Sequence, residues 1–212
     1  MNKSVIGLMA VGSLVLTGPA LADLNGISWD TVDSGMGLGT TYQLYADVNA
    51  GDQVNAVYGD DAVALQINAV NGSFYQHAFG GVTPPSQALI NAFPSLAYDS
   101  FVSIGRLTDT DDEMLEIGID WTNFEAGGPI FTDNGSWFAT PDNAQVHEVG
   151  GRVLIGQFTV AGEGLEGTIN IQGKDGALNN WNATDVYFNT VPAPGALALL
   201  GLAGLVARRR RK

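Results

Sequence analysis

The feature that most constrains the fold is an alternation of apolar and polar residues that recurs along the chain. It is clearest in residues 40–48, 62–70, 115–121 and 165–174, where nearly every second side chain is apolar. Because a period of two places successive side chains on opposite faces of a strand, each segment predicts a β-strand with one buried face. Shorter runs predict the remaining strands, at 52–58, 73–78, 100–104, 136–139, 152–160 and 185–189.

Clusters of Gly, Asn and Asp separate the predicted strands and mark turns. Asn71-Gly72 stands between two alternating runs, so it predicts a β-hairpin. One segment breaks the pattern, because residues 84–93 have Ser86 as a candidate N-cap and Pro94 as a stop, which predicts one short helix. Ten or so short strands with one-sided burial predict an all-β fold, an antiparallel β-sandwich in which a jelly-roll-like arrangement is one possible form.

The N-terminus carries the pattern of a secretory signal peptide. Lys3 provides a positive start, residues 5–16 are apolar, and Ala20 and Ala22 form a small-x-small cleavage site. We therefore predict that residues 1–22 are a signal peptide cut before Asp23, and that the chain is exported.

The C-terminus carries three features in a fixed order. Pro192, Ala193 and Pro194 are followed by thirteen residues, 195–207, without a polar side chain, and then by five cations: Arg208, Arg209, Arg210, Arg211 and Lys212. A buried helix would show a polar face, so a short transmembrane helix is predicted instead. The cations stay cytoplasmic under the positive-inside rule, which places everything N-terminal to the helix outside the cytoplasmic membrane.

This arrangement resembles the PEP-CTERM sorting signal of exported bacterial proteins. The resemblance covers residues 191–212, with Pro192, Ala193 and Pro194 on the recognition motif, 195–207 on the helix and 208–212 on the basic end. It implies membrane anchoring, then cleavage near the Pro motif by an exosortase and delivery to the cell surface or exterior. Ala193 departs from the pattern, which often has Glu at that position.

Residues 23–190 remain as one predicted domain, long enough to bury a core of its own. From Asp23 to Val191 the chain has three cations against twenty-two acids, a net charge of −19. A surface this acidic repels nucleic acid, so no nucleic-acid partner is expected. Cysteine is absent, so the exported domain depends on its core without disulfides.

No catalytic residue is predicted. His77 and His147 are the only histidines, and no known catalytic motif surrounds either of them. A glycan hydrolase would need two carboxylates facing each other across a cleft, and twenty-two acids make some such pair inevitable by chance. We expect a non-enzymatic domain and keep a secreted glycan hydrolase as the least favoured alternative.

Two groups of residues are candidates for binding. Asp109, Asp111, Asp112 and Glu113 could supply oxygen ligands to Ca²⁺, although a solvated acidic loop is the favoured explanation, and no other cofactor is expected. Trp137 and Trp181 flank turns and could stack on sugar rings, the alternative being that both are core residues. The sequence therefore predicts a surface or extracellular-matrix protein whose expected partners are signal peptidase, exosortase and the cytoplasmic membrane. A cell-surface carbohydrate-binding module is the alternative, with surface polysaccharide as its partner.

Overall fold

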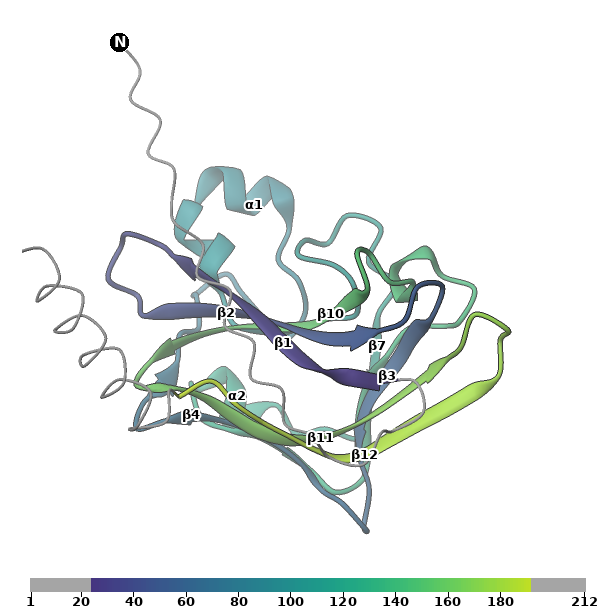
Figure 1. The fold of residues 1–212 in the computed structure, drawn as a ribbon. Helices are drawn as coiled ribbons and strands as arrows, with labels where there is room; N and C mark the ends of the chain where they lie inside the picture. Colours follow the sequence, from purple (N-terminus) through teal and green to yellow (C-terminus); the bar gives the residue numbers. More distant parts are fainter. Residues whose placement is uncertain (1–23, 192–212) are drawn as a thin grey trace, which may run out of the picture.

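A computed structural model describes residues 24–191, which form two antiparallel β-sheets packed face to face (Figure 1). The predicted all-β fold is confirmed. The predicted signal peptide, with Ala20, Ala22 and Asp23, and the predicted sorting signal from Pro192 to Lys212 lie outside the described residues. Between Leu24 and Val191, no helix has the length and apolarity needed to cross a membrane.

The first sheet has five strands, of which β10 is the central one. β1 pairs with β2 and β2 with β10, while the short strands β5 and β6 pair with successive parts of the other edge of β10. These strands are β1 (Leu24–Asp33), β2 (Thr40–Val48), β5 (Ser73–Phe74), β6 (Phe101–Val102) and β10 (Arg152–Ala161).

The second sheet has seven strands organised around β11. β12 lies along one edge of β11, and β3 and β4 share the other edge, with β9 and then β7 beyond β3 and with β8 beyond β4. The strands are β3 (Gln53–Gly59), β4 (Leu65–Val70), β7 (Leu115–Ile117), β8 (Ile130–Thr132), β9 (Gly135–Phe138), β11 (Gly164–Lys174) and β12 (Asn180–Asn189).

Asn170 of β11 fills the point where β3 and β4 separate. Its side-chain amide donates to the carbonyl of Val63 at 2.8 Å and accepts from the backbone N–H of Asp185 at 3.0 Å. The side chain is fully buried, and these bonds satisfy polar groups both beside the split between β3 and β4 and at the register shift between β11 and β12.

The core lies between the sheets and is formed by the inward side chains of both. Leu44 and Phe158 from the first sheet meet Ile169 and Trp137 from the second, and all four are fully buried. Phe124 of the short helix α2 (Thr122–Glu125) closes one side of the core and packs edge-on against Phe74 and Phe158.

The predicted hairpin at Asn71-Gly72 is wrong, because this turn leads from one sheet to the other. β4 pairs with β11 in the second sheet, and β5 pairs with β10 in the first. The turn from β10 to β11 also crosses between the sheets, next to the turn at Asn71-Gly72. The two turns are bonded through Asn71 Nδ2 and Glu163 Oε2, at 3.1 Å. A Cβ on Gly72 would lie 2.0 Å from the carbonyl oxygen of Ala161, so only glycine fits this close approach. The sequence pattern gave the turn correctly but could not show which strands it joins.

The predicted strand 115–121 is also corrected. Only Leu115–Ile117 forms a strand, β7, at the edge of the second sheet, and Leu115 and Ile117 are 56% and 66% exposed rather than buried. Gly118 has a φ of +74°, which turns the chain and ends the alternation. Trp121 lies beyond this turn and is partly buried against the core.

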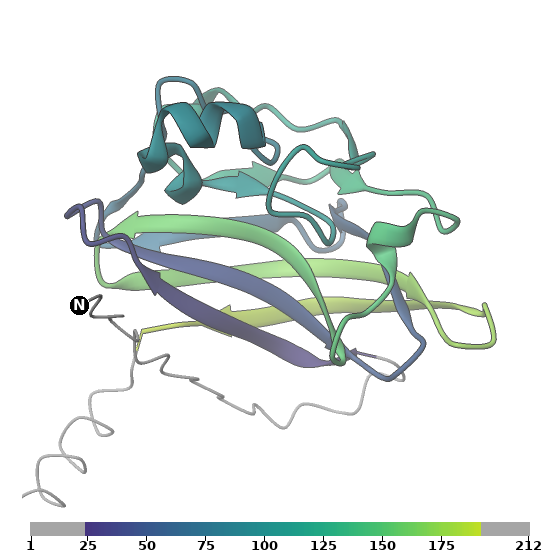
Figure 2. The ribbon, with the colours of Figure 1, turned by 90° about the horizontal axis from the view of Figure 1, so that it is seen from above.

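The predicted helix is present but shorter, as α1 (Gln87–Ala92), with Ser86 at its N-cap position. The Ser86 side chain makes no capping bond, and instead Asp109 Oδ1 accepts from the backbone N–H of Gln87 at 3.1 Å. Pro94 ends α1 as expected but also begins a 3-10 helix, η1 (Pro94–Tyr98). Both lie outside the first sheet, beside β10 (Figure 2).

Five elements were not predicted from the sequence, namely β1, β8, α2, η1 and η2. β1 mixes its apolar residues with Asn, Gly, Ser and Asp, and β8 is only three residues long, so neither gives a strong alternation. The 3-10 helix η2 (Ala144–Val146) is capped by Asn143, whose side chain accepts from the backbone N–H of Gln145.

Candidate functional site

The two tryptophans proposed as sugar platforms are both buried. Trp137, on β9, is fully buried, and its Nε1 donates to the carbonyls of Ser103 at 3.1 Å and Ile155 at 3.2 Å. Trp181, on β12, is 6% exposed, and its ring covers Gly173, where a Cβ would lie 2.4 Å from the ring. Neither ring can present a face to a sugar in this structure, so the alternative interpretation, core packing, applies to both.

The acidic segment 109–113 directs its carboxylates to different protein partners. Asp109 caps α1, Asp112 Oδ1 accepts from Gln145 Nε2 at 3.1 Å, and Glu113 Oε2 accepts from Asn143 Nδ2 at 2.5 Å. Asp111 is exposed, with a φ of +54°. Across residues 24–191, no three acidic or histidine side chains gather in a geometry that could hold a metal ion. The contacts of this segment are those of a structured loop that joins α1, η2 and β7.

The two histidines lie far apart in different surroundings. His147 is exposed beside the start of β3, where its Nε2 lies 3.5 Å from Gln53 Nε2. His77 belongs to an aromatic cluster with Tyr75, Phe79 and Phe93 above the first sheet, in which the Phe79 and Phe93 rings are 4.6 Å apart. Phe79 is 54% exposed and Phe93 40% exposed, so this cluster faces solvent.

Asp99 supports the loop that carries this aromatic cluster. Its carboxylate accepts from the backbone N–H of His77 at 2.7 Å and of Gly81 at 3.3 Å, and the residue is fully buried. Burial raises the pKa of Asp99 from its ordinary value of 3.8 to about 6, although these backbone hydrogen bonds favour the ionised form. Asp99 is therefore a buried carboxylate that titrates near neutral pH.

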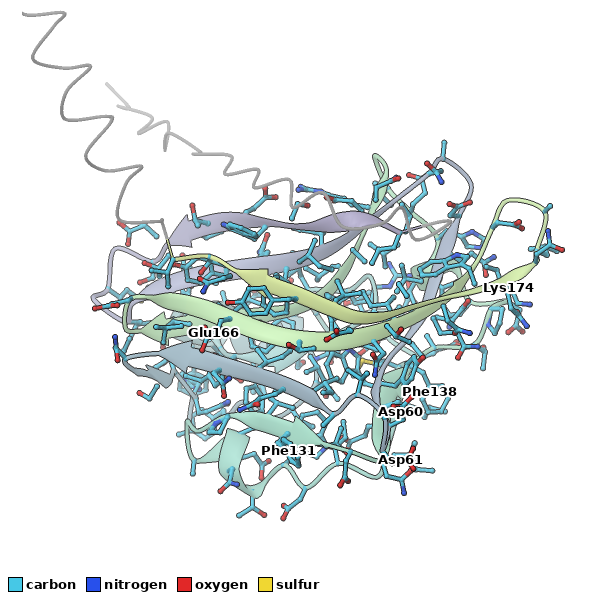
Figure 3. The ribbon with its side chains drawn as sticks, turned by 60° about the horizontal axis from the view of Figure 1, so that its bottom comes forward. Asp60, Asp61, Phe131, Phe138, Glu166 and Lys174 are labelled. Carbon is cyan, nitrogen blue, oxygen red and sulfur yellow. The ribbon has the colours of Figure 1, made fainter. Side chains whose placement is uncertain are left out.

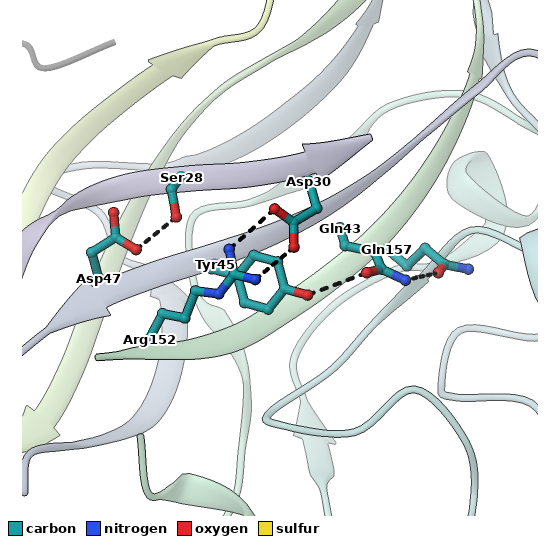
Figure 4. A network of polar contacts seen from close by, with 7 residues as sticks. All are labelled: Ser28, Asp30, Gln43, Tyr45, Asp47, Arg152 and Gln157. Carbon is teal, nitrogen blue, oxygen red and sulfur yellow. Dashed lines mark hydrogen bonds and ion pairs between the residues drawn. The ribbon is translucent and has the colours of Figure 1, made fainter. Parts of the chain in front are cut away.

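A polar network covers the outer face of the first sheet (Figure 4). Arg152 forms two hydrogen bonds to Asp30, at 3.2 and 2.6 Å, and its guanidinium lies 3.9 Å from the centre of the Tyr45 ring. The hydrogen bonds that Arg152 donates to Asp30 raise the pKa of Arg152, while burial raises the pKa of Asp47, whose carboxylate accepts from Ser28 at 2.6 Å. These side chains are paired with one another, so the network links β1, β2 and β10.

The network continues towards η1 and ends under it. Gln43 Nε2 donates to Gln157 Oε1 at 3.1 Å, and Gln157 Nε2 donates to the carbonyls of Ala97 and Asp99, both at 3.0 Å. Thr159 is fully buried and bonds to the carbonyl of Tyr98. This part of the outer face is therefore covered by protein and is not available for a ligand.

The outer face of the second sheet has a different character, and Figure 3 looks onto it with Glu166 and Phe131 labelled. Side chains from four neighbouring strands share this face because they are directly opposite one another or two residues apart. We call it the amide face, and its residues are Gln66 and Asn68 on β4, Phe131 on β8, Glu166 and Thr168 on β11, and Tyr187 and Asn189 on β12.

The amide face is open to solvent. Phe131 is 55% exposed, Tyr187 is 50% exposed, and Gln66 is exposed between them. The residues on the inner side of the same strands, such as Leu65, Ile67 and Leu165, are fully buried. Sequence reasoning used the apolar half of the alternation to find the core, whereas the polar half of the same strands carried the signal for this surface.

Comparison of the chain with protein-family models, with curated proteins and with solved structures finds no match.

Proposed function

We propose that this chain is an exported surface or extracellular-matrix protein whose acidic β-sandwich acts without catalysis. The observation that carries the proposal is the order of features at the two ends: a signal peptide over residues 1–22, and a Pro motif, apolar segment and basic end over 192–212. In this proposal the C-terminal segment holds the chain in the cytoplasmic membrane until an exosortase cuts near Pro192, and signal peptidase cuts before Asp23.

The position of the last strand supports this proposal. Thr190 donates its backbone N–H to the carbonyl of Leu165 at 2.8 Å, and Thr190 Oγ1 accepts from the backbone N–H of Leu165 at 2.7 Å. The backbone N–H of Val191 donates to Asn189 Oδ1 at 2.7 Å. The hydrogen bonds of the domain therefore reach Val191, directly before the proposed sorting motif at Pro192.

Mass spectrometry of the protein recovered from cells and from medium tests the proposal. Mature chains are expected to begin at Asp23 and to end close to Pro192. Replacing both prolines of the motif, Pro192→Ala and Pro194→Ala, is expected to leave the chain uncut in the membrane, whereas the control Ala193→Glu, which restores the more frequent family pattern, is expected to preserve cutting. Exported chains that still end in Lys212 would show that exosortase sorting is wrong.

Carbohydrate binding is the second candidate function. Its original candidate residues, Trp137 and Trp181, are buried, so it needs another surface. The amide face favours it, because amide side chains beside exposed aromatic rings are the groups that sugars contact. Surface polysaccharide would then be the partner of the folded domain.

A further inference from the structure

We propose that the amide face binds a neutral polysaccharide, which lies across β8, β4, β11 and β12. This inference deepens the second candidate function by assigning it a site and a ligand class. It concerns the folded domain alone, so it stands or fails independently of how the two ends of the chain are processed.

The geometry of the face fits an extended ligand. Phe131, Gln66, Thr168 and Tyr187 are directly opposite one another on successive strands, so they form one row across the sheet. Three strand spacings of ~4.8 Å separate the ends of this row, which gives ~14 Å between the two aromatic positions. A sugar chain laid along the row would meet an aromatic ring at each end and polar side chains between them.

The aromatic ring at one end of the row is held in place. Asn189 Nδ2 donates to the Tyr187 hydroxyl at 3.0 Å and lies 3.4 Å from Glu166 Oε2. Because its oxygen already accepts a bond, the Tyr187 hydroxyl can direct its proton to a ligand. A ring fixed before binding loses little conformational entropy when a sugar stacks on it.

The hydrogen-bonding groups of the face suit hydroxyl groups. Gln66 Nε2 donates to Asn68 Oδ1 at 3.1 Å, which orients both amides, and Gln66 is exposed to solvent. Amides and a carboxylate together offer both donors and acceptors, and a hydroxyl needs one of each. An apolar partner would leave these groups desolvated and unpaired, which disfavours it.

Charge selects a neutral ligand over an anionic one. Glu166 is the one charged residue of the amide face as defined, and the domain from Asp23 to Val191 has a net charge of −19. An anionic polymer would approach against this field, whereas an uncharged chain of hydroxyl groups would not be repelled.

Affinity electrophoresis of the full chain in native gels tests the inference. The gels would contain one of four neutral polysaccharides (a β-glucan, a mannan, a galactan or a xylan) or the anionic polymer alginate. Retardation is expected in at least one neutral gel and not in alginate. The double variant Phe131→Ala and Tyr187→Ala is expected to reduce the association constant by about tenfold or more, a factor equivalent to ~1.4 kcal/mol.

Two further variants make the result specific. Phe79→Ala removes a ring of similar exposure from the aromatic cluster near α1, so it is expected to bind as the original chain does. Tyr187→Phe keeps the ring and is expected to keep most of the binding. Matching circular dichroism spectra and thermal midpoints would show that the variants fold.

The inference is overturned if none of the four neutral polysaccharides retards the chain, or if alginate retards it as strongly. It is also overturned if the double variant binds unchanged, or if either Phe79→Ala or Tyr187→Phe loses as much binding as the double variant.

Discussion

Replacing Asp99 by Asn should remove a specific part of the pH dependence of stability. The folded protein holds Asp99 with a pKa raised to about 6, mainly by burial, against an ordinary value of 3.8. Since the folded state binds this proton more tightly than the unfolded state, the protein gains stability as pH falls through 6. The full gain is ~3 kcal/mol at ~1.4 kcal/mol per pKa unit, and about 1.4 kcal/mol of it is present at pH 5.

Urea denaturation at pH 8 and at pH 5 measures this effect in the original chain and in Asp99→Asn. The free energy of unfolding of the original chain should rise relative to the variant by about 1.4 kcal/mol between these two values. The amide can still accept the hydrogen bond from His77 but does not ionise, so the comparison cancels the other acids that titrate in this range. Equal pH dependence in the two chains would refute the assignment of a buried carboxylate with a raised pKa at Asp99.

Other carboxylates set the lowest pH at which these denaturation measurements are useful, because their protonation lowers stability whereas that of Asp99 raises it. Hydrogen bonds lower the pKa of four acids at the surface, namely Asp120, Asp142, Glu148 and Asp175. A lowered pKa contributes stability that is lost as pH falls below the ordinary value, near 4. Measurements at pH 5 and above therefore avoid these four acids, and the comparison with Asp99→Asn cancels the contribution of Asp47, whose pKa is also raised by burial.

Three further substitutions have outcomes that thermal or urea denaturation would check. Gly72→Ala should destabilise by ~2 kcal/mol or more, because the new Cβ would meet a backbone carbonyl at 2.0 Å, whereas Gly81→Ala, with open space around it, should change stability by less than ~0.5 kcal/mol. Trp137→Phe should cost ~2 kcal/mol more than Trp181→Phe, since the Nε1 of Trp137 bonds two buried carbonyls and that of Trp181 has no acceptor among the described residues. Arg152→Ala should lose ~1 kcal/mol, much of it screened by salt, because its ion pair is partly exposed.

The sequence predicted a strand well where one face of that strand is buried in the core and the other faces outward. The predicted bounds of the strand Thr40–Val48 match β2 at both ends, because its apolar side chains face the core and its polar side chains face outward. The prediction failed for 115–121, where β7 is an edge strand and its apolar residues face solvent. Periodicity reports that alternate residues share a face but does not say which face is buried.

The candidate site was harder to predict than the strands. Trp137 follows a turn in sequence, which favours exposure, yet β9 directs it inward between the sheets. The amide face is formed by β4, β8, β11 and β12, and it exists only because β11 pairs with strands on both of its edges. Pairing between segments so distant in the chain is a tertiary property that no local pattern contains.

The chain passes back and forth between the two sheets, and this has a consequence for the order in which the molecule can assemble. β2 needs β10 as a neighbour, and Gln43 bonds to a residue 114 positions later, so most of the chain must be present before this pairing forms. β3 likewise cannot form its pairing until β11 is present. Neither sheet can be completed from one half of the chain, so the domain should close late and in one cooperative step, with no cysteine available to fix a partial arrangement.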